Sequence, residues 1–554
     1  MELKDLETAF YQLGSQFLLS ILTLVIAKLI YNYVHWIVVY RPKLKSFPQL
    51  ENFSYFTGHF STHSNVMLKN PEKHLPHRLN LAKKYPNGYW EAWHPMTRMN
   101  PWINVHDPVA VKAVLTLKYD KAPKYQPIVK PFMIGTKPYS IFFCNGDMWK
   151  NHRHVINLQF NQKLLKAYMP VVNNCVKTMI DKWQSHIDQN SDNSEYSKAF
   201  NIHQDFMLLT LDVLLQTLMS YESDCQTSTS VENGDKFVAA VVDWLSAWHS
   251  RMESPLGLSE FLYTTFSFRG RKNLKSAKYM YEVALKLVMD RQDLYREDPE
   301  YQSDKERLDL IDILVAGSQE NGKPFTYDEI IMETIIFMIA GFETTANTLT
   351  WTLSHLARSR TDYLSKIYPE VDKLTEELKL RSLLNFDKGY ENLLEQKDLD
   401  TLTFMDSAIK ETLRITPIGQ RIFSRVMERD ILLPDGRNLP AGVPIHINIL
   451  DLHRREDLFL DPDDYIPERF LSREISKNEY NQTKIDPFAY IPFSAGARNC
   501  IGRHFANQEM RSTLFHIFEK FEISAEGCQD PVAIIKITLR PQNGIFLKIK
   551  NRVL

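Results

Sequence analysis

The stretch "PFSAGARNCIG", residues 492 to 502, places a single cysteine, Cys500, among two glycines, an arginine and a phenylalanine. Binding of a metal by the thiol would explain why glycines and the other specialised residues surround it. A lone thiolate suits zinc poorly, because structural zinc needs four protein ligands. Haem iron needs only one axial ligand from the protein, since the porphyrin supplies four nitrogens. The alternative is a buried structural thiol, the commonest role of a cytosolic cysteine.

The neighbours of this cysteine each have a reason to stand beside a haem. Gly496 and Gly502 let the backbone approach the macrocycle closely. Arg498 can neutralise a haem propionate, and Phe493 can shield the sulfur from water. The sequence after Gly502, "RHFANQEM", predicts a helix, and a helix N-terminus favours a thiolate. These features favour a haem ligand over a structural thiol.

The spacing F-x-x-G-x-R-x-C-x-G is matched at every specified position, and it resembles the haem-binding signature of the cytochrome P-450 family. This resemblance implies haem b with the Cys500 thiolate as axial ligand. It also implies a mainly α fold with small β-sheets (α+β). The resemblance extends over nearly the whole chain, from "TGHF" near residue 57 to "RPQNGIFLKIK" at the end.

Residues 328–359 are apolar nearly all round and lack proline, which predicts a long helix through a large core. Within them "AGFETT" resembles the family's A-G-x-[DE]-T-[TS] segment. The resemblance implies that Glu343 and Thr344 relay the protons that dioxygen activation requires. Ala340 shares a helical face with Thr344, and Gly341 is expected to leave room above the iron. A surface Glu-Thr pair is the alternative, but an uncompensated glutamate is costly in so apolar a helix.

Two further motifs are expected to build the scaffold and the propionate site. "ETLR" and "PERF" resemble the family's structural triad, which here is Glu411, Arg414 and Arg469. "WKNHR" resembles the family's W-x-x-x-R, in which both side chains, here Trp149 and Arg153, reach one propionate. The arginine in "RIFSRVMERD", Arg425, aligns with another propionate-binding arginine of related microsomal members.

The composition excludes several other classes of protein. The chain has 554 residues and a formal net charge of −1, so no basic excess indicates a nucleic-acid partner. Five scattered cysteines form no C-x-x-C, which argues against a zinc ribbon or a disulfide framework and favours a reducing compartment.

The N-terminus predicts a membrane anchor. Residues 17–39 are mostly apolar and long enough to span a bilayer. Because Lys28 interrupts them, either the span runs over about residues 9–27 with "LIYNYVHWIVV" along the membrane, or Lys28 snorkels. The basic "RPKLK" that follows predicts a cytosolic catalytic domain. We therefore expect an anchor over residues 1–45 and a haem-thiolate monooxygenase domain over 46–554, single-pass in the endoplasmic reticulum membrane.

The implied reaction inserts one oxygen atom from O2 into a lipophilic small molecule. Since the chain has no flavin or nicotinamide fingerprint, electrons are expected from NADPH–cytochrome P-450 reductase and in some cycles cytochrome b5, with Lys150 and Arg503 helping to dock the reductase. Two alternatives are a haem-thiolate isomerase or dehydratase and a non-catalytic haem-binding protein. The acid–alcohol pair counts against both.

The sequence leaves the substrate open among fatty acids, sterols and foreign lipophiles. Residues 131–143 and the "RPQNG" turn are expected to line an apolar pocket, with Phe142, Phe143 and Phe342 as candidate wall residues or plain core. Fatty-acid ω-hydroxylases that bond their haem covalently carry a glutamate where this chain has Ala340, so no haem ester is expected. Two polar tracts, 185–198 and 385–400, are expected to be surface connections.

Overall fold

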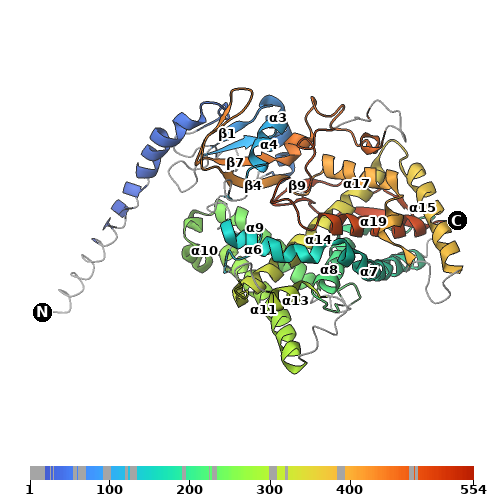
Figure 1. The fold of residues 1–554 in the computed structure, drawn as a ribbon. Coiled ribbons are helices and arrows are strands. Elements are labelled where there is room, and N and C mark those ends of the chain that lie inside the picture. The colour runs from blue at the N-terminus through green and yellow to red at the C-terminus, as the bar shows by residue number, and fades with distance from the viewer. Residues whose placement is uncertain are drawn as a thin grey trace, which may run out of the picture.

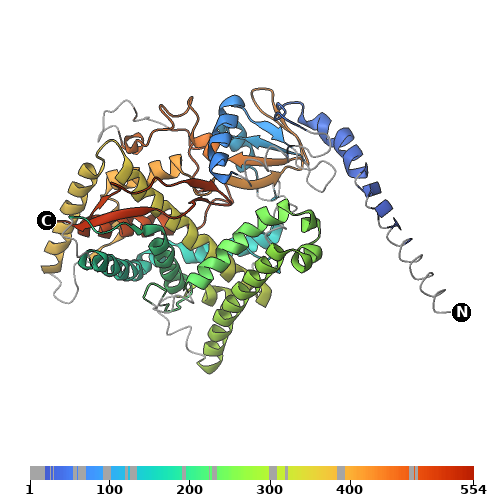
Figure 2. The same cartoon turned by 180° about the vertical axis from the view of Figure 1, so that it is seen from behind.

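A computed structural model describes residues 16, 19–20, 22–24, 26–28, 30–53, 59, 70–91, 101–118, 123–124, 134–135, 137–189, 195–223, 225–227, 234–298, 308–317, 322–383, 393–472, 480 and 485–553. Helices predominate within these residues, and short strands form small sheets, as expected for a mainly α fold. Figure 1 shows a helical body with a small sheet region beside the N-terminal helix, and Figure 2 shows the same arrangement from behind.

The main helices are, in chain order, α3 (His74–Lys84), α4 (Pro108–Leu115), α6 (Gly146–Asn157), α7 (Gln162–Asp188), α8 (Ile202–Leu218), α9 (Gly234–Glu253), α10 (Glu260–Phe266), α11 (Phe268–Glu297), α13 (Leu310–Ala316), α14 (Tyr327–Arg358), α15 (Leu364–Leu383), α16 (Gln396–Leu399), α17 (Thr403–Ile415), α18 (Ile449–His453) and α19 (Arg503–Lys520). Short π or 3-10 segments include η1 (Trp36–Tyr40), η2 (Arg41–Leu44) and η8 (Pro467–Phe470).

The strands are β1 (Tyr89–Glu91), β2 (Trp102–Val105), β3 (Phe200–Asn201), β4 (Arg421–Val426), β5 (Ile431–Leu432), β6 (Asn438–Leu439), β7 (Pro444–Asn448), β8 (Phe521–Ser524), β9 (Ala533–Ile535), β10 (Leu539–Pro541) and β11 (Phe546–Asn551). The largest sheet has the order β1-β2-β7-β4, in which only β2 and β7 pair in parallel. Smaller sheets are β3-β11-β8, β10-β9 and β5-β6.

The long helix α14 is the centre of the helical body. Thr326 and Glu329 form a capping box that starts it, and it ends at Arg358, so the helix predicted over 328–359 is confirmed. It packs against α8, α11, α17 and α19, and almost every residue along it is buried. The apolar character that predicted a core helix therefore follows from neighbours on several sides.

A second hydrophobic cluster joins the N-terminal segment to the sheet. Trp36, Leu44 and Phe47 are buried against residues of β2 and β7, among them Val105 and Ile445. The backbone of Leu50 donates to Trp90 O at 3.1 Å, and Trp90 N donates to Pro48 O at 3.0 Å. These hydrogen bonds attach the chain after the anchor to the edge of β1.

The N-terminal helix itself meets the requirements of a membrane span. By length and composition, the helix over Leu22–Lys43 is long and apolar enough to cross a membrane, with a mean hydropathy of 1.6. Lys28 lies within it, 5.0 Å from the ring centroid of Tyr31.

Some expectations about connections need correction. The tract 185–198 is not wholly a surface connection, because α7 continues to Asp188. The first half of the tract 385–400 lies outside the described residues, and the second half contains α16. The "TGHF" segment lies almost wholly outside them as well. Most of the C-terminal "GIFLKIK" forms β11.

Candidate active site

The loop before α19 presents Cys500. Its backbone N–H donates to Phe493 O at 2.9 Å, which closes a tight turn around the intervening residues. Gly496 adopts a φ of +72°, and a Cβ there would lie 2.0 Å from the carbonyl oxygen of Leu115. Both the backbone conformation and this close approach require glycine. The half-buried ring of Phe493 packs against the main hydrophobic cluster.

The surroundings of the Cys500 sulfur disfavour a free thiolate, and ligation to iron would offset this cost. Burial raises the pKa of the thiol, while a hydrogen bond from the Gly502 N–H and the charges of Arg153 and Arg503 act in the opposite direction. The residue nevertheless has exposed surface. A coordinated metal ion deprotonates a thiol outright and would overcome the burial effect.

The predicted arginines and tryptophan gather around the cysteine loop. Arg498 donates to Cys144 O and to Asn145 Oδ1, both at 3.0 Å. Its guanidinium lies 4.4 Å from the centroid of the Trp149 ring, so the two side chains stack. Arg153 donates to Asn499 O at 3.0 Å and to Asn499 Oδ1 at 2.8 Å. Helix α6 therefore both contributes to the site and holds the loop.

The buried Arg425 and the half-buried Lys124 complete this group of cations. Arg425 is 4% exposed, and its Nη1 is buried without a hydrogen-bond partner. Burial and then Arg498 lower its pKa to about 9. Burial also lowers the pKa of Lys124 well below its usual value, and the charges of Arg425 and Arg498 lower it further. A strand bridge pairs Lys124 with Arg425.

Such a group of cations fits the two carboxylates of a haem. Within the described residues, the charged neighbours that shift these pKa values are other cations and the Cys144 thiol. Buried cations without carboxylates are costly, and an anionic ligand would remove that cost. Sequence reasoning missed Lys124, because it belongs to no motif and only the strand bridge places it beside Arg425.

The acid–alcohol pair lies midway along α14. Glu343 is 3% exposed, and Thr538 Oγ1 donates to its Oε1 at 2.8 Å. Burial raises the pKa of Glu343, although Thr538 and the charge of Arg540 oppose the shift. Thr344 Oγ1 donates to Ala340 O at 2.8 Å. Ala340 is exposed and Thr344 half-buried, whereas Glu343 is buried.

Gly341 has a packing role that the sequence did not reveal. A Cβ at Gly341 would lie 1.9 Å from Leu214 Cδ1, so the missing side chain permits α14 to approach α8. Room above the iron was the expected reason for this glycine. In the observed packing, a side chain at this position would have to displace the Leu214 side chain.

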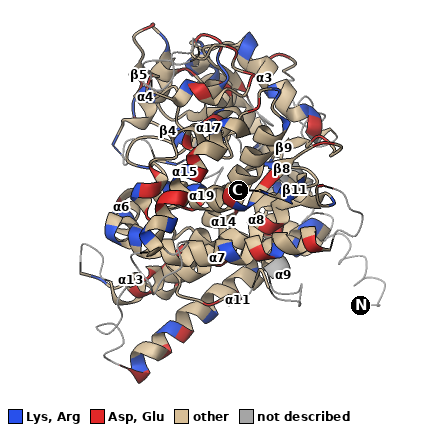
Figure 3. Ribbon diagram, turned by 90° about the vertical axis from the view of Figure 1, so that its right-hand side faces the viewer, with Lys and Arg blue, Asp and Glu red and all other residues tan. Residues whose placement is uncertain are grey.

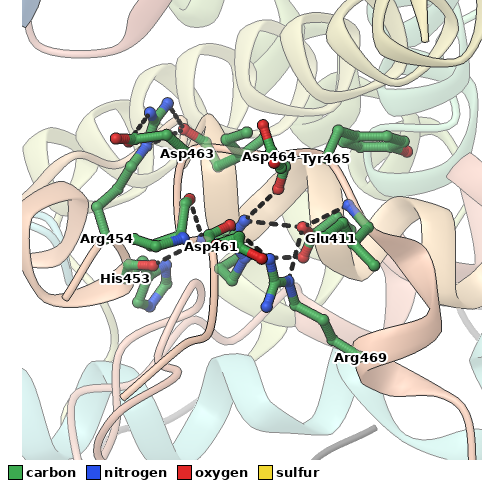
Figure 4. Close-up of polar contacts among 12 residues, drawn as sticks. Glu411, His453, Arg454, Asp461, Asp463, Asp464, Tyr465 and Arg469 are labelled. Carbon is green, nitrogen blue, oxygen red and sulfur yellow. Dashed lines mark hydrogen bonds and ion pairs between the residues drawn. The ribbon is translucent and has the colours of Figure 1, made fainter. Parts of the chain in front are cut away.

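The predicted triad is formed and fully buried. Glu411 accepts from Arg414 Nε at 2.8 Å and from Arg414 Nη2 at 2.7 Å, and it accepts from Arg469 Nε at 3.2 Å. Figure 4 shows Glu411 pointing toward Arg469, with the loop that carries Asp461 between them and His453. The arginines also donate to backbone carbonyls of this loop, namely those of His453, Leu460, Asp461, Pro462 and Asp464. The triad thus fixes irregular backbone rather than touching the site.

A buried histidine links α6 to α14 and was also missed. His152 Nδ1 lies 2.6 Å from Glu333 Oε1, and its Nε2 lies 3.4 Å from Glu329 Oε1. The backbone N–H of Ile141 donates to the same Glu333 oxygen at 2.5 Å. The position of His152 between Trp149 and Arg153 in "WKNHR" was the available signal.

The expected pocket walls are only partly described. Phe143 and Phe342 are fully buried in the main hydrophobic cluster, so both belong to the core. Phe142 is half-buried against that cluster. Residues 131–133 and 136 lie outside the described residues. Thr538, two residues before the "RPQNG" turn, donates a hydrogen bond to Glu343 of α14.

Comparisons with known proteins agree with this geometry. The family model "Cytochrome P450" matches residues 63–549. Human Cytochrome P450 4Z1 is 29% identical over 481 residues, which cover 84% of this chain and 88% of that protein. Mouse Leukotriene-B4 omega-hydroxylase 3 is 28% identical over 550 residues, covering 97% and 94%. Rat Cytochrome P450 4F1 is 29% identical over 516 residues, covering 92% and 90%. Because the family model covers most of its length, the chain belongs to the cytochrome P450 family of haem-thiolate monooxygenases, in which a cysteine ligates the haem iron.

Proposed function

We propose that Cys500 is the axial thiolate and that Arg498, Arg425, Lys124 and Trp149 bind the haem carboxylates. The observation that carries this proposal is the group of cations beside the cysteine loop, of which Arg425 is buried and Lys124 and Arg498 are half-buried. When bound, the haem supplies the activation of dioxygen and the transfer of one oxygen atom to substrate. Arg153 acts through Asn499 and holds the loop in place.

Glu343 and Thr344 are proposed to deliver the protons that this chemistry consumes. The raised pKa of Glu343 keeps a proton available closer to neutral pH than an exposed glutamate would. Thr538 and Thr344 supply hydroxyl groups at the buried carboxyl and at the exposed turn of α14. The relay therefore leads from the C-terminal turn to the face of α14 that carries Ala340.

The proposed substrate is a lipophile with a long unbranched chain, hydroxylated at or near its terminal carbon. Support comes from the similarity to a leukotriene-B4 omega-hydroxylase over nearly the whole chain. Ala340 has no carboxylate, so no ester to the haem can form at this position. Acidified organic solvent should therefore extract all of the haem, and haem that stays with the polypeptide would contradict this part of the proposal.

The proposed electron donor is NADPH–cytochrome P-450 reductase, assisted by cytochrome b5, at the cytosolic face of the endoplasmic reticulum. Figure 3 shows basic residues on α6, which carries Lys150, and Arg503 begins α19 and is exposed. Reversing both charges should weaken reductase coupling, and unchanged coupling would remove this docking surface from the proposal.

The exposed apolar residues of α10 and the start of α11 support a position at a membrane. Phe261, Phe266 and Phe268 are 69%, 63% and 76% exposed. Both views place α10 on the side of the molecule from which the N-terminal helix extends (Figures 1 and 2). Exposed aromatic groups of this size commonly mark an interface with protein or membrane.

The deciding experiment compares the carbon-monoxide difference spectrum of reduced wild type with that of Cys500→Ala. A strongly red-shifted Soret band in wild type and none in the variant is expected. Addition of NADPH, reductase and a long-chain fatty acid should then give a terminal hydroxylation product. Rearrangement of a peroxide without reductase would favour the isomerase alternative, and the absence of haem in folded protein would overturn the proposal.

A further inference from the structure

A groove lies where the N-terminal helix meets the sheet. It has a volume of about 490 Å³ and is lined in part by the apolar side chains of Ile37, Phe47 and Trp90. Arg41 and Lys45 also line it, and both are exposed. Among the described residues that line the groove, none is acidic. The groove thus combines apolar walls with two positive charges.

The two sides of the groove are held in a fixed relation. On one side, the backbone around Gln49 pairs with Trp90 at the edge of β1. Ile37, which also lines the groove, follows Trp36 in η1, and Trp36 is 3% exposed and stacks on Phe53 with ring centroids 5.3 Å apart. Both sides belong to the same hydrophobic cluster. A preformed groove of this kind binds a ligand without the entropy cost of ordering its walls.

The position along the chain places the groove at the surface of a bilayer. The apolar helix over Leu22–Lys43 ends in η2, which supplies Arg41 to the groove. If that helix spans the membrane, as the proposed anchoring requires, the groove lies at the level of the lipid headgroups. Anionic headgroups are the negative charges that are concentrated there.

We propose that this groove binds an anionic glycerophospholipid. Its phosphate lies between the Arg41 guanidinium and the Lys45 ammonium, and the first part of an acyl chain packs against Ile37, Phe47 and Trp90. A soluble anion would leave the apolar walls uncovered. A choline headgroup would bring a cation of its own toward the two basic side chains, so anionic lipid is preferred over phosphatidylcholine.

The chain offers a matched control for this site. Lys43 lies between the two groove cations in sequence but does not line the groove, and its Nζ donates to Ala441 O at 2.9 Å. Lys43→Gln therefore removes the same charge from the same segment as Arg41→Gln or Lys45→Gln. If the basic side chains were attracted only diffusely to an anionic surface, the three variants should lose the same amount of lipid binding.

The test uses the full-length haem protein in bilayer nanodiscs of phosphatidylcholine mixed with a photoreactive phosphatidylserine. After illumination, mass spectrometry of peptides locates the adducts, which are expected on the segments that carry Phe47 and Trp90. Arg41→Gln and Lys45→Gln should each lower this labelling roughly fivefold, and Lys43→Gln should leave it unchanged. Equal loss in all three variants, or adducts scattered over the chain, would overturn the proposal.

A second measurement separates this inference from the anchoring on which it rests. Alkaline carbonate extraction tests whether wild type and each variant stay with the membrane, and the carbon-monoxide spectrum tests whether each is folded around its haem. Release of wild type by carbonate would refute the anchoring itself. Retention without enrichment of phosphatidylserine over photoreactive phosphatidylcholine at the groove would refute the lipid site alone.

Discussion

Burial lowers the pKa of three neighbouring cations, Arg425 and the half-buried Lys124 and Arg498. Burial and then Arg498 bring the pKa of Arg425 to about 9, whereas burial brings the pKa of Arg498 to about 10 although the Cys144 thiol opposes this shift. A dianionic ligand would stabilise all three charged forms at once. Haem binding should therefore depend on each of these side chains through electrostatics, separately from the bond between iron and sulfur.

Arg425→Met tests this dependence at one residue. The variant should lose haem to excess apomyoglobin faster than wild type, by a factor on the order of 30 or more, since breaking a buried charge pair costs about 2–5 kcal/mol. The carbon-monoxide difference spectrum should keep its position, because Cys500 is untouched. Arg425→Lys should restore part of the affinity.

The control for this variant is Arg421→Met on the same strand. Arg421 donates to Asn448 Oδ1 at 3.0 Å and faces His446, so its loss removes a half-buried cation elsewhere in the sheet. Haem loss from this control should match wild type. Equal acceleration in both variants would show that strand β4, and not the Arg425 charge, governs haem retention.

At the level of single residues, the motifs identified most of the candidate site, but they did not reveal which contacts hold these residues in place. Arg498 of the cysteine loop stacks on Trp149 of α6, two residues that the motifs singled out. Lys124 could not be found, because its relation to Arg425 is a contact between segments far apart in sequence. The motif singled out Gly341 as leaving room above the iron. Its close approach to Leu214 of α8 joins segments far apart in sequence, so no local pattern could predict it.

Among the elements, the triad on α17 and η8 offers the clearest stability prediction. Glu411→Gln leaves Arg414 and Arg469 buried without their carboxylate, and removal of one partner from a buried pair costs about 3–5 kcal/mol. Thermal or denaturant unfolding should show this loss. Glu377→Gln, which breaks an exposed contact of 4.0 Å with Arg381, should change stability by no more than about 0.5 kcal/mol. A similar loss in both variants would contradict the special role of the triad.

The contact between α6 and α14 should make stability depend on pH. Burial opposes the charge on His152, but its hydrogen bond and ion pair with Glu333 prevail and raise the pKa of the imidazole. Burial also raises the pKa of Glu333. Both shifts mean that the folded protein binds more protons than the unfolded chain, so stability falls as pH rises.

His152→Gln removes this titration. Its stability deficit relative to wild type should be largest below about pH 6.5, the unperturbed pKa of histidine, and should shrink as pH rises through the raised pKa. Denaturant unfolding at a series of pH values measures the difference. A deficit that grows with pH would show that the pair contributes in its neutral form.

Elements were predictable where the pattern and the environment agreed. The run of apolar residues defined α14 to within a residue at each end, because a capping box starts the helix and nearly all its faces are buried. The polar tract after residue 185 was predicted to be a surface connection, but its first residues are the last turn of α7. Polar residues are compatible with a helix at the surface, so the composition could not separate the two.

For the whole molecule, the sequence indicated a mainly α domain behind an apolar helix, but not how the two are joined. The apolar residues near position 36 were fully explained by a membrane, so nothing in the pattern pointed to a contact with the sheet. Trp36 and Leu44 are nevertheless 3% and 1% exposed within the cluster that contains Val105 and Ile445. The end of the anchor therefore belongs to the packed core of the sheet region.

A comparison of two truncated chains tests this coupling. A chain that begins at Ser46 loses Trp36 and Leu44, whereas one that begins at Val34 keeps both. Burial of each side chain contributes about 1.5–3 kcal/mol, so the shorter chain should unfold at lower denaturant concentration, by a few kcal/mol in total. Substitution of Trp36 and Leu44 by alanine in the longer chain should reproduce the loss, while Val38→Ala, at a position that is 64% exposed, should not. Equal stability of the two chains would mean that the anchor is an independent tether, and the groove beside it would then lack the rigid wall that a bound lipid requires.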